Sequence, residues 1–202
     1  MRRLILCFVA LIGLSACAAE SVYAPQEAVT AARFVADPPT SITLYTVINN
    51  RSGAGAHSGL LINASQQVMF DPAGTWQHPR IPERNDVHYG ITPRMVNFYI
   101  DYHARETFRV IEQTLVVSPG VAELVKQRAE AYGAVPKAQC ANSITSILGG
   151  VPGFDSLGPT WYPKKLSDEF GKLPGVRSRT ITDGSADKNH GVLLVQAENA
   201  PR

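Results

Sequence analysis

The stretch of residues 41–71 reads SITLYTVINNRSGAGAHSGLLINASQQVMFD. Its apolar, β-branched and aromatic residues gather in three runs, which is typical of strands. The runs are residues 41–49, 57–62 and 66–70. The segments between them are rich in Gly, Asn and Ser, which favour turns. The stretch therefore predicts three strands that fold back on one another as an antiparallel sheet.

The rest of the chain adds helices and two further strands to this sheet. Thr92-Pro93 and Ser118-Pro119 each place a capping residue before a proline, which is typical of a helix start. We expect helices at residues 26–35, 93–103, 119–132, 139–148 and 163–173, and strands at 107–117 and 176–181. Several prolines and many polar residues predict a long surface loop over residues 72–91. The fold class is α+β, a small antiparallel sheet packed with helices in one domain, residues 41–202.

The N-terminus has the pattern of an export signal. Arg2 and Arg3 precede an uncharged, mostly apolar run, Leu4–Leu14, of 11 residues. A membrane-spanning helix needs about 20 residues, so this run fits a secretory signal instead. The run leads into Leu14-Ser15-Ala16-Cys17, which resembles the lipobox of bacterial lipoproteins.

That resemblance implies a lipid-anchored protein of the bacterial cell envelope. Residues 1–16 would be the signal peptide, and Cys17 would carry a diacylglyceryl group and an acyl chain such as palmitate. Three acyl chains exceed the two signals that stable anchoring needs. Residues 17–40 would be the lipidated N-terminus and tether. Ala18 in place of Asp favours the periplasmic side of the outer membrane over the inner one.

Composition excludes several other classes of protein. The chain has 202 residues, of which 45% are hydrophobic, so it is not disordered. A net charge of +2 is too small for a nucleic-acid-binding surface. Removal of residues 1–16 takes away Arg2, Arg3 and Cys7, which leaves a formally neutral chain. With Cys17 acylated, Cys140 is then the remaining free thiol, and a disulfide within the mature chain is excluded.

Cys140 has the setting of a nucleophile. It stands at the predicted start of a helix, where unpaired backbone N–H groups and the helix dipole favour a thiolate. A thiol nucleophile needs a base, and the base needs a group that orients it. His57 begins the second predicted strand and Asp71 follows the third. If these strands pair around residues 63–65, His57 and Asp71 meet at the same end of the hairpin.

This order of residues resembles the papain-like superfamily in its circularly permuted form. Ordinary NlpC-type peptidases place the Cys helix first. Permuted relatives, including the lecithin:retinol acyltransferase-like proteins, place the His strand first and the Cys helix late. The matching segments are Ala56–Ile62, Val68–Asp71 and Gln139–Ser143.

The papain-like resemblance implies a nucleophile, Cys140, a base, His57, and a third polar member, Asp71. It also implies cleavage of an amide or ester bond, or acyl transfer, through a Cys140 thioester. The substrates of the superfamily include peptidoglycan peptides and lipids.

Less specific interpretations stay open. A single cysteine in a short apolar helix is also typical of a packed core residue, and the chain would then be a non-catalytic envelope scaffold or binding lipoprotein. We expect His78 and His190 to be solvated in polar loops, and His88 and His103 to lie at the surface or in local hydrogen bonds. No metal-ligand spacing and no cofactor motif appears, so we expect neither a metal nor a cofactor.

Overall fold

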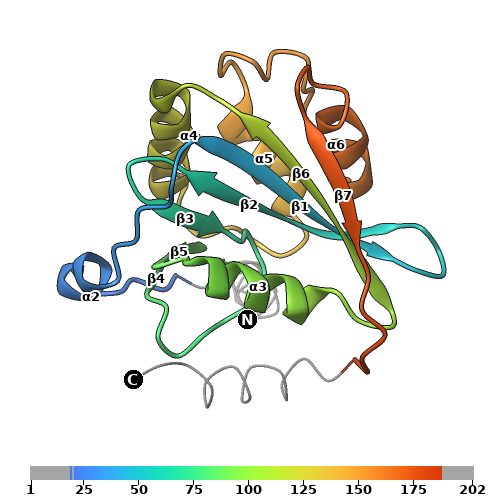
Figure 1. The fold of residues 1–202 in the computed structure, drawn as a ribbon, viewed down its shortest axis with the longest axis horizontal. Coiled ribbons are helices and arrows are strands. Elements are labelled where there is room, and N and C mark those ends of the chain that lie inside the picture. The colour runs from blue at the N-terminus through green and yellow to red at the C-terminus, as the bar shows by residue number, and fades with distance from the viewer. Residues whose placement is uncertain (1–18, 20, 188–202) are drawn as a thin grey trace, which may run out of the picture.

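The structure, a computed structural model, describes residue 19 and residues 21–187 and contains one seven-stranded antiparallel sheet (Figure 1). The strand order across the sheet is β4-β5-β3-β2-β1-β6-β7. The strands are β1 (Ser41–Asn49), β2 (Gly55–Asn63), β3 (Gln67–Phe70), β4 (Glu83–Arg84), β5 (Val87–Tyr89), β6 (Phe108–Val116) and β7 (Arg177–Ile181). Together with its helices this sheet confirms the predicted α+β class.

The hairpin predicted from residues 41–71 forms the centre of the sheet. Strand β1 pairs with β2 from Ser41 opposite Asn63 to Val47 opposite His57, followed by a β-bulge. Strand β3 pairs with β2 only as far as Phe70 opposite Leu60. Within the described chain, the first part of β2, which carries His57, therefore has no strand beside it on the β3 side.

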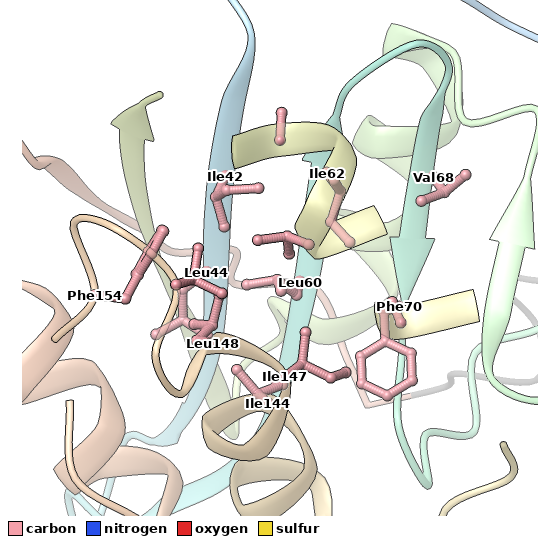
Figure 2. Close-up of a cluster of buried hydrophobic side chains, with 14 of the residues drawn as sticks. Ile42, Leu44, Leu60, Ile62, Val68, Phe70, Ile144, Ile147, Leu148 and Phe154 are labelled. Atoms are coloured by element: carbon pink, nitrogen blue, oxygen red, sulfur yellow. The ribbon is translucent and has the colours of Figure 1, made fainter. Parts of the chain in front are cut away.

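The structure describes five helices, and four of them, α3 to α6, cover the two faces of the sheet unequally. The five helices are α2 (Gln26–Ala31), α3 (Pro93–His103), α4 (Pro119–Tyr132), α5 (Cys140–Leu148) and α6 (Pro163–Phe170). Helices α4, α5 and α6 lie on one face, where they enclose the larger apolar cluster (Figures 1 and 2). Helix α3 lies on the other face and contributes to a second cluster. The sheet is therefore the middle layer of three.

The alternation of side chains along the strands assigns residues to the two clusters. Leu44 and Leu60 point toward α5 and α6, whereas the next residues, Tyr45 and Leu61, belong to the cluster on the α3 side. Successive residues of a strand face opposite sides of a sheet. Because both sides are covered here, every residue of β1 from Ile42 to Ile48 is buried.

Both predicted proline-led helices begin where their capping residues indicate. The side chain of Thr92 accepts a hydrogen bond from the Met95 N–H in α3, and Ser118 accepts one from the Val121 N–H in α4. Helix α4 ends before Gly133, whose φ of 88° lies in the region that favours glycine. These local signals predicted the ends of α3 and α4 correctly.

The prediction of a surface loop over residues 72–91 is wrong. This segment contains β4 and β5, which extend the sheet beyond β3. Asn85 and Asp86 connect the two strands with φ values of 47° and 67°, as a two-residue hairpin turn requires. The segment also packs inward, since Trp76 is only 1% exposed. Its prolines and polar residues favoured the prediction of a loop, and its two strands are too short to show a clear alternation.

The described part of the N-terminal segment lies against the sheet. Val29 of α2 is buried in the larger cluster, and the Ala24 N–H donates to the Glu83 carbonyl at 2.9 Å. Helix α2 ends at Ala31 rather than at residue 35. No helix among the described residues is long and apolar enough to cross a membrane. Cys17 and the apolar run 192–195 lie outside the described residues.

Candidate active site

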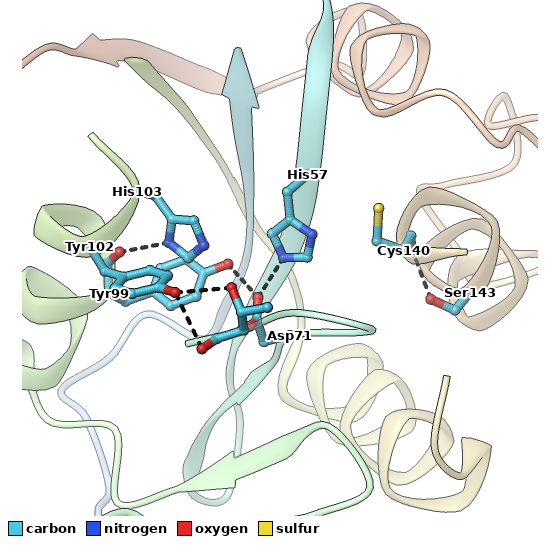
Figure 3. Close-up of polar contacts among 8 residues, drawn as sticks. His57, Asp71, Tyr99, Tyr102, His103, Cys140 and Ser143 are labelled. Carbon is cyan, nitrogen blue, oxygen red and sulfur yellow. Dashed lines mark hydrogen bonds and ion pairs between the residues drawn. The ribbon is translucent and has the colours of Figure 1, made fainter. Parts of the chain in front are cut away.

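Three elements that are distant in sequence bring His57, Asp71 and Cys140 together (Figure 3). His57 lies in β2, Asp71 directly follows β3, and Cys140 is the first residue of α5. Because β3 ends at Phe70, the start of α5 approaches the edge of β2 that β3 leaves uncovered. The end of β3 therefore positions Asp71 beside His57, and the start of α5 positions Cys140.

His57 and Asp71 form a close, buried pair, as the hairpin predicted. The His57 Nε2 atom lies 2.6 Å from the Asp71 Oδ1 atom, and Asp71 is 1% exposed. Burial lowers the pKa of His57, but the Asp71 carboxylate outweighs burial and raises that pKa above its ordinary value. Burial likewise raises the pKa of Asp71, and His57 outweighs it, so that pKa falls well below its ordinary value. The pair is therefore stabilised in its charged form.

Tyr99 binds the same carboxylate oxygen as His57. Its hydroxyl donates to the Asp71 Oδ1 atom at 2.8 Å. Two glycines make this packing feasible, because a Cβ atom on Gly59 would lie 2.2 Å from the Tyr99 hydroxyl. A Cβ atom on Gly74 would lie 1.7 Å from the Asp71 Oδ2 atom. Gly59 of the His-Ser-Gly segment thus leaves room for the Tyr99 hydroxyl, which a larger residue would exclude.

Cys140 is the one free cysteine among the described residues, and it faces His57. Burial raises the pKa of its thiol, but His57 and the backbone N–H groups of Ser58 and Ala141 outweigh burial and lower it. Gln139, which precedes the helix, makes no side-chain hydrogen bond to the N–H groups of the first turn. The arrangement favours a thiolate–imidazolium pair.

The remaining free ring nitrogen of His57 is the one that serves the thiol. Since Nε2 is bonded to Asp71, Nδ1 is directed toward the α5 side, where Figure 3 places Cys140. The Cys140 residue is 6% exposed and the His57 side chain 15%, so the imidazole is the more accessible partner. A thiol, an imidazole and a carboxylate are thus arranged in the order that acyl transfer would require.

Tyr99 and His103 are site residues that sequence reasoning missed. They are four residues apart in α3 and so lie on the same face of that helix. The His103 Nδ1 atom lies 2.8 Å from the Tyr99 carbonyl oxygen, which confirms the expected local hydrogen bond. The Tyr-x-x-x-His spacing at 99–103 is the signal that could have placed both residues together.

The histidines expected at the surface are buried instead. His78 is 4% and His88 is 3% exposed, so the expected solvated role of His78 is wrong. The ring of His88 packs against the edge of Trp76, with centroids 5.2 Å apart. Burial lowers the pKa of His88 to about 4, so its imidazole is neutral at pH 7. His190 lies outside the described residues.

Comparison with known protein families, with curated protein sequences and with solved structures gives no match for this chain. The function of this chain is therefore inferred from the arrangement of His57, Asp71 and Cys140.

Proposed function

We propose that this protein is a thiol hydrolase or acyltransferase of the bacterial cell envelope. The observation that carries the proposal is the buried His57–Asp71 pair, joined at 2.6 Å, with Cys140 at a helix start on the other side of the imidazole. The papain-like resemblance of the sequence gives the same three residues the same roles. Peptidoglycan peptides and lipids are the substrate classes that this resemblance supplies.

The reaction proceeds in two steps, acylation of Cys140 and then deacylation. The Cys140 sulfur attacks an amide or ester carbonyl carbon, and the N–H groups at the start of α5 are available to the oxygen that becomes negative. The C–N or C–O bond then breaks, and His57 gives its proton to the leaving amine or alcohol. Water or a second alcohol or amine attacks the thioester, His57 takes the proton from it, and the C–S bond breaks. Asp71 keeps the imidazole oriented throughout.

Alkylation of the thiol tests the first requirement of this mechanism. We expect iodoacetamide to modify Cys140 well below pH 8.5, the ordinary pKa of a thiol, because His57 favours the thiolate. The His57→Gln variant should move the alkylation profile to higher pH. The His88→Gln variant, which changes a buried histidine outside the triad, is the matched control and should leave the profile in place. Alkylation that occurs only after unfolding would contradict the proposal.

Covalent trapping tests the second requirement. With a nitrophenyl ester as the acyl donor, we expect an acyl adduct on Cys140 in the mass spectrum of the intact protein. His57→Gln should suppress the adduct by about 100-fold or more, as loss of a general base does. An adduct that persists in Cys140→Ala would show acylation at another residue and would contradict the assignment.

One observation favours a second function, a non-catalytic envelope scaffold or binding lipoprotein. Cys140 is only 6% exposed and contacts the apolar side of the sheet through its helix, as a packed core thiol would. The two functions differ in their response to Cys140→Ala. Under the scaffold function this variant keeps the cellular phenotype, whereas under the enzymatic function it matches a deletion.

A further inference from the structure

His103 is a buried base that the thiol mechanism does not use. Its ring lies 5.6 Å from the His57 ring, centroid to centroid, and is nearly parallel to it. Because a carbonyl oxygen only accepts, His103 Nδ1 donates its proton to the Tyr99 carbonyl, 2.8 Å away. The proton is thereby fixed on Nδ1, and Nε2 carries a free lone pair.

His103 belongs to a compact group of residues that could ligate a metal ion. His57, Asp71 and His103 each offer one ligand atom, and the three atoms lie within 4.8 Å of one another. Asp71 contributes a second feature, because its buried Oδ2 atom has no hydrogen-bond partner among the described residues. Such an atom is unfavourable in a protein interior unless a cation or a donor satisfies it.

The chemistry of these donors suits zinc. Two imidazole nitrogens and one carboxylate oxygen form a ligand set of three-ligand zinc sites, in which water takes the fourth position. The Tyr99 carbonyl provides the outer hydrogen bond that typically orients a ligating histidine. Tetrahedral zinc with bonds of about 2.0 Å separates neighbouring ligand atoms by about 3.3 Å. The His57–Asp71 contact of 2.6 Å must therefore open by less than 1 Å.

We propose that Zn²⁺ binds between His57, Asp71 and His103 and thereby switches off the thiol chemistry. The zinc replaces the Nε2 proton that His57 shares with Asp71. The metal-bound imidazole then keeps its Nδ1 proton, because losing it would leave an imidazolate, so His57 can no longer give that proton to the leaving group. The inhibition rests on the proposed function, whereas the binding itself does not. Zinc held by Cys140 and His57 Nδ1 is the competing arrangement.

The experiment separates these arrangements in the full mature chain carrying Cys140→Ala. We expect isothermal titration with ZnCl₂ to give one bound zinc per chain in this variant, since the thiol is not a ligand. The additional change His103→Gln should weaken binding by about 100-fold or more, as loss of a direct ligand does. The control His88→Gln should leave the affinity within about threefold. Loss of binding in Cys140→Ala alone would overturn the proposal.

Nitrogen NMR of the histidines gives an independent reading that needs no further variant. In Cys140→Ala protein, zinc should shift the Nε2 resonances of His57 and His103 and leave those of His88 unchanged. Unchanged His103 resonances would overturn the site. If zinc binds as expected but wild-type protein shows no acylation of Cys140, the proposed function fails and the metal site stands. If acylation occurs and zinc does not bind, the reverse holds.

Discussion

Tyr99 shows how one hydroxyl supports the site without touching the thiol. It donates to the Asp71 Oδ1 atom, which also contacts His57, and it is 1% exposed. The interactions that lower the Cys140 pKa come instead from His57 and from the backbone of Ser58 and Ala141. The structural support of the carboxylate and the activation of the thiol are therefore separable.

Tyr99→Phe should consequently lower stability more than it changes thiol reactivity. Removal of a buried hydrogen bond to a charged group costs about 1–3 kcal/mol of the free energy of unfolding. Urea denaturation measures this loss. The pH profile of Cys140 alkylation should stay close to that of the wild type. A shift of that profile as large as the shift in His57→Gln would show that the Tyr99 hydroxyl also contributes to activation of the thiol.

His88 makes stability depend on pH in a definite direction. The unfolded chain takes up a proton at His88 near its ordinary pKa of about 6.5, whereas burial keeps the folded pKa at about 4. The unfolded state therefore binds more protons between these values, and the free energy of unfolding falls as the pH drops from 6.5 to about 4. His103, whose pKa burial also lowers to about 4, adds a second contribution of the same sign.

Thermal melts between pH 4 and pH 7 should reveal the His88 contribution. We expect His88→Gln to lose less stability than the wild type on acidification, because one of the two neutral histidines is gone. The contribution of His103 remains in this variant. A difference between wild type and His88→Gln that does not change with pH would contradict the assignment.

At the scale of elements, β2 and α3 pack closely because Gly59 has no side chain. Gly59 of β2 lies against the Tyr99 hydroxyl of α3, and a Cβ atom there would come within 2.2 Å of the oxygen. The next contact of that Cβ, with the ring carbon that bears the hydroxyl, would be 3.1 Å. The clash at Gly59 therefore arises mainly from a single oxygen atom.

Gly59→Ala should destabilise the fold by about 1–3 kcal/mol, the usual cost of overpacking. In a Tyr99→Phe background the same change should cost clearly less, because the clashing oxygen is absent. Gly120→Ala in α4 is the matched control, since nothing lies within 4 Å of a Cβ atom there. Equal costs of Gly59→Ala in the two backgrounds, measured by denaturation, would show that the hydroxyl is not the obstacle.

Sequence reasoning succeeded where a local signal specified an element. The run of β-branched and aromatic residues at 41–49 and the cap-and-proline pairs at Thr92 and Ser118 predicted the bounds of β1, α3 and α4 closely. The hairpin placed His57 next to Asp71 because strand pairing fixes which residues face one another. The roles of Tyr99 and His103 depend on how α3 packs on the sheet, which no local pattern specifies.

At the scale of the whole molecule, the described chain is a three-layer domain in which the sheet and a helix packed on it together position His57, Asp71 and Cys140. The catalytic roles of Cys140, His57 and Asp71 stay predictions, as does the lipid anchor at Cys17. The strands β4 and β5 were missed because two- and three-residue strands carry too little periodicity to predict. They matter for the site, since the Asp71 N–H donates to the Asp86 carbonyl in the turn between them.

The predicted lipid anchor determines where the domain is held in the envelope. We expect Cys17→Ser to release the protein from the membrane fraction into the soluble fraction, because no acyl chain can be attached. Mass spectrometry of the N-terminal peptide of the wild type should show an acylated Cys17. An unmodified Cys17 at a mature N-terminus would refute the anchor, whatever the activity of Cys140.

The separation of His57 and Cys140 in the sequence determines at which stage of folding the thiol and the imidazole can meet. His57 and Cys140 are more than eighty residues apart, so they meet only after the hairpin has formed and α5 has docked on it. Forming contacts between such distant residues is a slow step of folding. Before that moment Cys140 is an ordinary thiol with a pKa of about 8.5, mostly protonated at neutral pH. An unfolded chain thus carries only an ordinary thiol at Cys140, and the proposed reactivity would require completed folding.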